Sequence, residues 1–132
     1  MDQEVLVKEF RKILPELERR TGPVSLVLLV APDEDTVSSW NVIVGAPSFD
    51  EKSIGDAVEE VADSLRSRLK KSLWPIVARV TTLRTNDPFF LGLRRDFPSL
   101  TPGATLHGVR VSGIDIPRAI VIESKKKRRR AA

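Results

Sequence analysis

An amphipathic pattern between residues 50 and 73 constrains the fold of this chain more than any other feature. Its apolar side chains recur at steps of three and four residues, which places them on one face of an α-helix. They are Ile54, Ala57, Val58, Val61, Leu65, Leu69 and Leu73. Acidic residues fill the first half of the stretch and basic residues the second, so the charges complement the helix dipole at both ends. We expect this helix to cover one face of a β-sheet, and it carries no catalytic signature.

Two apolar segments precede this helix. Residues 24–31 are almost continuously apolar, which is typical of a central strand covered on both faces. Residues 40–46 have the composition of a second strand, and the polar, turn-rich connection over residues 32–39 favours an antiparallel hairpin.

The rest of the chain alternates between helical and β patterns. A first helix is predicted over residues 2–20, with a kink or break near Leu14 because Pro15 cannot donate a helical hydrogen bond. A third strand is predicted over residues 76–84, and a short helix begins near Asp87-Pro88. Residues 106–111 and 116–123 predict a final hairpin, in which Pro117 favours an edge position or the start of its strand.

These elements predict one fold class. We expect an α+β domain with a mostly antiparallel sheet of about five strands, in the order α-β-β-α-β-α-β-β. The two longer helices pack on one face, and a short third helix completes the core. The tryptophans and phenylalanines stand in apolar contexts that indicate core positions rather than base stacking.

The positive charge of the chain is concentrated at its C-terminus. The net charge is +4 and the pI about 9.8, yet six basic residues are consecutive: Lys125, Lys126, Lys127, Arg128, Arg129 and Arg130. Without them, 16 of the 22 basic residues remain against 18 acidic ones, so the body is slightly acidic. We therefore predict a single domain over residues 1–124 and a disordered basic tail over residues 125–132, which can contact nucleic acid or another polyanion.

Several chemistries are disfavoured by composition. The chain has no cysteine and one histidine, His107, so a thiol nucleophile, a Cys-ligated zinc site and a two-histidine zinc site are excluded. Neither of the common glycine-rich nucleotide-binding motifs is present. The acidic loop at residues 33–35 is interpreted as a solvated turn. We assign no catalytic residue, no metal ligand and no cofactor, and we expect a cytoplasmic protein without a membrane span.

Arginines in the predicted strands and their flanks are a second candidate site. Strand alternation could gather Arg79, Arg84, Arg110 and Arg118 into an anion-binding surface, although the register is not defined by sequence.

Our leading hypothesis is a non-enzymatic module that associates with a protein partner or forms a homodimer, while the basic tail attaches electrostatically to nucleic acid or another polyanion. One alternative is an enzyme that processes nucleic acid or a phosphorylated ligand with the strand arginines and loop carboxylates. The other is a regulatory domain with a small-ligand pocket between the central helix and the sheet.

Overall fold

The computed structural model describes residues 3–32 and 39–125 as an α+β fold around one five-stranded sheet. The helices are α1 (Gln3–Arg11), α2 (Leu14–Thr21), α3 (Ile54–Arg68) and α4 (Pro88–Asp96), with short 3-10 helices at Pro47–Glu51 and Lys71–Ile76. The strands are β1 (Leu26–Ala31), β2 (Trp40–Gly45), β3 (Val77–Leu83), β4 (Thr105–Val111) and β5 (Ile114–Ser124). The fold class predicted from the sequence is confirmed.

The sheet has the strand order β3-β2-β1-β5-β4. The two predicted hairpins are present, because β1 pairs antiparallel with β2 and β4 pairs antiparallel with β5. The pairing of β2 with β3 is parallel, since α3 carries the chain back to the end of the sheet at which β2 began. The nearly all-apolar β1 lies at the centre, as its composition predicts, and β3 and β4 are the two edge strands among the described residues.

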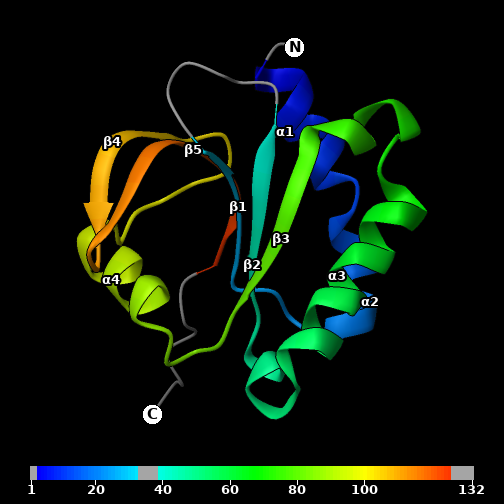
Figure 1. The fold of residues 1–132 in the computed structure, drawn as a ribbon, viewed down its shortest axis with the longest axis horizontal. Helices are drawn as coiled ribbons and strands as arrows, with labels where there is room; N and C mark the ends of the chain where they lie inside the picture. Colours follow the sequence, from blue (N-terminus) through cyan, green and yellow to red (C-terminus); the bar gives the residue numbers. More distant parts are fainter. Residues whose placement is uncertain (1–2, 33–38, 126–132) are drawn as a thin grey trace.

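The helices divide between the two faces of this sheet. Figure 1 shows α1, α2 and α3 on one face, whereas α4 lies on the other, beneath the curled β4–β5 hairpin. Each face has its own apolar core: Val42 and Val61 belong to the core beneath α1–α3, and Leu28 and Leu93 to the core beneath α4. No helix in the described part of the chain is both long and apolar enough to cross a membrane.

The central helix is shorter than its sequence pattern predicted. It begins at Ile54, where the Ser53 hydroxyl caps the helix by accepting a hydrogen bond from the Asp56 N–H (3.1 Å), and it ends at Arg68. Leu69 and Leu73 are still buried, but they lie beyond the last helical turn. The apolar stripe predicts that Ile54 is buried, but its side chain is 69% exposed. The stripe meets the sheet only from Ala57 onward.

The predicted break in the first helix is confirmed. The α1 helix ends at Arg11 and α2 begins at Leu14, with Pro15 in the first turn of α2, where a missing N–H is tolerated. The two segments then follow different directions over the same face of the sheet (Figure 1).

The β4–β5 hairpin bends sharply at one position on each strand. Gly108 has a φ of +57°, and the register places Pro117 opposite it, between the pairs His107↔Arg118 and Val109↔Ile116. Although β5 is an interior strand, its pairing with β1 begins only at Arg118, so Pro117 lies where β5 has no β1 neighbour. The bend folds the hairpin tip over α4 (Figure 1).

Candidate functional site

The four predicted anion-binding arginines lie in different places. Arg79 is exposed on β3 and Arg110 on β4, at opposite edges of the sheet and four strand spacings, roughly 19 Å, apart. Arg84, just beyond β3, donates a hydrogen bond to the Lys52 carbonyl (2.8 Å), and Arg110 forms an ion pair with Asp115 (3.3 Å). The fold therefore does not bring these four side chains into one cluster.

Arg118 is held within the fold. Its guanidinium lies 5.7 Å from the centre of the Trp40 ring and donates a hydrogen bond to the Gln3 side chain (3.2 Å). Its Nε atom is buried and has no hydrogen-bond partner among the described residues. Arg118 thus joins the start of α1 to the sheet, and His107, its partner across the register, is exposed.

The first residue of the basic run contacts the folded body. The Lys125 N–H donates a hydrogen bond to the Ser25 carbonyl (2.9 Å), and its ammonium lies 3.0 Å from a Glu18 carboxylate oxygen. Arg94 donates hydrogen bonds to the carbonyl oxygens of Ser25 and Lys125. The other five basic residues, 126–130, lie outside the described residues, as does the acidic loop at 33–35.

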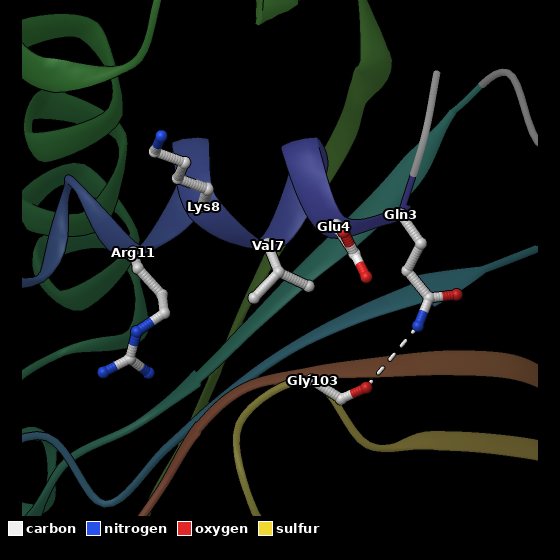
Figure 2. A pocket seen from close by; sticks show the side chains of 6 residues that line it. All are labelled: Gln3, Glu4, Val7, Lys8, Arg11 and Gly103. Atoms are coloured by element: carbon white, nitrogen blue, oxygen red, sulfur yellow. Dashed lines mark hydrogen bonds between the residues drawn. The ribbon is translucent and has the colours of Figure 1, made fainter.

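A surface hollow of about 720 Å³ lies between α1 and the loop before β4 (Figure 2). Gln3 bridges its two sides by donating a hydrogen bond to the Gly103 carbonyl (3.5 Å). Figure 2 shows Lys8 pointing away from Gly103, and Arg11 donates to the Ile122 carbonyl (2.6 Å). These contacts tie α1 to the sheet, and the lining residues include no pair of groups arranged for acid–base catalysis.

A smaller hollow of about 320 Å³ lies beyond the ends of β2 and β3, beside the N-termini of α3 and α4. Several of the charged groups there are engaged in contacts. Lys52 pairs with Glu60 (2.5 Å), and the Asp87 carboxylate caps α4 by accepting the Phe89 N–H (2.9 Å). Nearby, the hydrogen bonds that Asp50 accepts from Thr85 lower the pKa of Asp50. This arrangement stabilises the helix ends.

The layer between α3 and the sheet is apolar. Val61 and Leu65 of α3 are buried against Val42 and Val44 of β2. Ser64 is also buried there, and its hydroxyl donates a hydrogen bond to the Glu60 carbonyl (2.9 Å), one turn earlier. In the described part of the chain, no group of three or more potential metal-ligating side chains occurs.

The candidate site that remains lies along the outer edge of β3. An apolar groove of about 220 Å³ runs between this strand and α3. It is lined by Ala62, Leu65, Arg66, Leu69, Trp74, Val77 and Val80. Among the described residues, the backbone of β3 pairs only with β2, so its other side offers hydrogen-bonding groups next to an apolar surface.

Trp74 forms one wall of the groove, and its position is fixed. Its indole N–H donates a hydrogen bond to the Leu69 carbonyl (3.1 Å), and the Lys71 ammonium lies 5.9 Å from the ring centre. The sequence pattern placed Trp74 in the core, but 39% of its surface is exposed, whereas Trp40 is buried as expected. On the rim, the hydrogen bond from Arg66 to Asp63 raises the pKa of Arg66.

Sequence reasoning missed this groove because its residues were interpreted as core or as solvated helix face. One signal in the sequence does mark the region. Between Asp63 and Asp87 the chain has six basic residues and no acidic residue.

Comparison with known proteins finds no matching family model, no matching curated protein and no matching solved structure.

Proposed function

We propose that this protein is a non-enzymatic interaction module that binds an extended segment of a partner protein along the outer edge of β3. The observation that carries the proposal is that the outer side of β3, which has no strand partner among the described residues, lies beside the apolar groove at Trp74. A segment added to a sheet edge gains affinity from backbone hydrogen bonds, and alternate side chains gain specificity from the adjacent surface. The groove supplies such a surface on the α3 side of the strand.

The two edge strands differ in their suitability for this role. β4 is interrupted by Gly108, whose positive φ bends the strand, and a bent edge is a poor template for pairing. β3 contains neither glycine nor proline over its seven residues, a length of about 23 Å. The α3 helix also packs on the β3 end of the sheet and forms the second wall of the groove.

The basic run at the C-terminus has a second role in this proposal. Residues 126–130 attach the module to nucleic acid or another polyanion by releasing counterions from phosphates. Lys125 supports this role because its contacts with Ser25 and Glu18 fix the position of the residue that precedes residues 126–130 in the chain.

The edge-binding proposal can be tested by selecting peptides from a displayed random library with the full-length protein. We expect selected peptides to perturb the NMR amide signals of β3 and α3. We also expect binding to weaken by at least about tenfold in Ala62→Gln, which places a longer side chain in the groove, and in Trp74→Ala, which removes its wall.

The matched control is Ser67→Gln, which introduces the same side chain at an exposed position of α3 outside the groove. It should leave peptide binding unchanged, and circular dichroism should show all three variants folded. Failure to select any peptide, or perturbation confined to residues away from β3 and α3, would contradict the proposal.

The tail proposal is tested by comparing the intact chain with a variant in which residues 126–130 are all serine. Lys125 is retained because it belongs to the contacts of the body. We expect duplex DNA and RNA binding that weakens with salt, with a log–log slope no steeper than about −4.5 for five phosphate contacts, and its loss in the serine variant. If the variant binds equally well, the tail proposal is wrong, and the arginines of the sheet become the candidate site.

A further inference from the structure

Exposed basic residues surround the β3 edge, although Arg66 pairs with Glu59 and Asp63, and Arg68 lies 4.0 Å from a Glu16 carboxylate oxygen. All six basic residues between Asp63 and Asp87 are exposed, and no acidic residue lies between them in sequence. They are Arg66, Arg68, Lys70, Lys71, Arg79 and Arg84. This concentration contrasts with the whole body, which is slightly acidic without its tail. The edge therefore carries an electrostatic signature as well as an apolar groove.

Two of these cations stand at the edge without a carboxylate partner. Lys71 lies over Trp74 and Arg79 projects from β3, and neither forms an ion pair with a described residue within 4.0 Å. The register places Arg79 and Val80 on opposite faces of the sheet, with Val80 on the groove side. A strand added beside β3 would thus meet apolar side chains and Lys71 on one face and Arg79 on the other.

We infer that the segment bound at β3 is an extended peptide in which apolar and acidic residues alternate; this inference rests on the proposed function. Successive side chains of a strand point to opposite faces, so its apolar residues enter the groove between Ala62, Trp74 and Val80. The acidic residues then lie on the face of Arg79, and Lys71 adds positive charge beside the groove. Charge complementarity thus selects the partner and fixes its register.

The same charges argue against a second copy of this chain as the occupant. Pairing of two β3 edges would bring Lys71 and Arg79 of both copies together, and like charges across an interface are unfavourable. An acidic partner instead neutralises them.

The inference is tested with three labelled peptides of about eight residues, matched to the length of β3, in which valine alternates with glutamate, glutamine or lysine. Binding is measured with the full-length chain and with the serine-tail variant, which removes contacts between acidic peptides and residues 126–130. We expect the glutamate peptide to bind about tenfold or more tightly than the glutamine peptide, with a preference that declines as salt is added.

Charge reversal supplies the second measurement. The double variant Lys71→Glu, Arg79→Glu should bind the lysine peptide more tightly than the glutamate peptide. The control Arg95→Glu, at an exposed position of α4 outside the groove, should keep the original preference. NMR amide perturbations locate each complex.

The outcomes separate the inference from the function on which it rests. Equal binding of the glutamate and glutamine peptides at β3 would overturn the acidic partner and leave edge binding intact. Binding of none of the three, when library-selected peptides do perturb β3, would also overturn it. If the library selection fails as well, the proposed function itself is wrong.

Discussion

Gly92 of α4 lies so close to Ser112, in the β4–β5 turn, that a Cβ atom at position 92 would overlap the serine hydroxyl oxygen. It would also approach a Val111 methyl carbon to 3.0 Å. The Ser112 hydroxyl donates a hydrogen bond to the Pro88 carbonyl (2.7 Å), which fixes the hydroxyl at the contact. The folded hairpin tip thus depends on the absence of a side chain at Gly92.

Gly92→Ala should therefore destabilise the protein, by about 1–3 kcal/mol, because the added methyl group overpacks this contact. Chemical denaturation measures the free energy of unfolding. Gly55→Ala is the matched control, since Gly55 lies in the first turn of α3 with its nearest neighbour at 4.0 Å. It should stabilise the protein by about 0.4–1 kcal/mol. Equal effects of the two substitutions would contradict the close approach of α4 to the turn.

The elements that the sequence predicted well are those specified by local patterns. The apolar run of β1, the stripe of α3 and the break at Pro15 each depend on neighbouring residues, and all three are present. The β4–β5 hairpin is also present, but its turn is only Ser112 and Gly113, both with positive φ, and β5 begins at Ile114 rather than at residue 116.

The candidate site was harder to predict because it depends on long-range arrangement. Whether β3 pairs on one side or two is decided by the strand order, which no local pattern encodes. Trp74 stands in an apolar stretch, yet it is partly exposed because α3 ends before it and the chain turns toward β3. The separation of Arg79 from Arg110 likewise follows from their positions on opposite edge strands.

The second prediction concerns acid stability. Glu16 of α2 accepts hydrogen bonds from Arg19 (2.6 and 2.9 Å) and from Arg20 (3.0 Å), and these lower its pKa from an ordinary value of 4.5 to about 2. A folded-state pKa below the unfolded one gives stability that is present above about pH 4.5 and is lost as the pH falls toward 2.

Glu16→Gln should therefore lower stability near neutral pH and flatten the decline of stability between about pH 5 and pH 2. Urea denaturation across this range measures the effect, since urea adds no ionic strength. Glu51→Gln is the control, because the Glu51 side chain is exposed and makes no hydrogen bond or ion pair with a described residue. An unchanged pH profile in Glu16→Gln would show that the arginine contacts contribute nothing to acid stability.

The third prediction concerns the end of β5. Arg94 donates hydrogen bonds to the carbonyl oxygens of Ser25 (2.9 Å) and Lys125, and desolvation by burial lowers its pKa. Arg94→Ala should destabilise the protein by about 1.5–3 kcal/mol, because hydrogen bonds from a charged donor are lost. Hydrogen exchange of the Lys125 amide should accelerate most.

Arg95→Ala is the matched control for this substitution. Arg95 is the next residue of α4, is exposed, and pairs only with Asp96 (3.0 Å) among the described residues. It should leave both the stability and the Lys125 amide almost unchanged. If the two alanine variants behave alike, Arg94 does not fix the position of Lys125. The support that Lys125 gives to the proposed role of the basic run is then removed.

The last prediction concerns the bend that distinguishes β4 from β3. Gly108 adopts a φ of +57° and has no atom within 4 Å of the position of a Cβ, so a substitution there changes backbone strain rather than packing. Gly108→Val should destabilise the protein by about 1–2 kcal/mol, because a β-branched residue is disfavoured in the left-handed region. Gly108→Asn should cost less, since asparagine enters that region more readily. Thermal and urea unfolding compare the two variants, and an equal cost for both would show that the backbone at position 108 does not hold this conformation in solution.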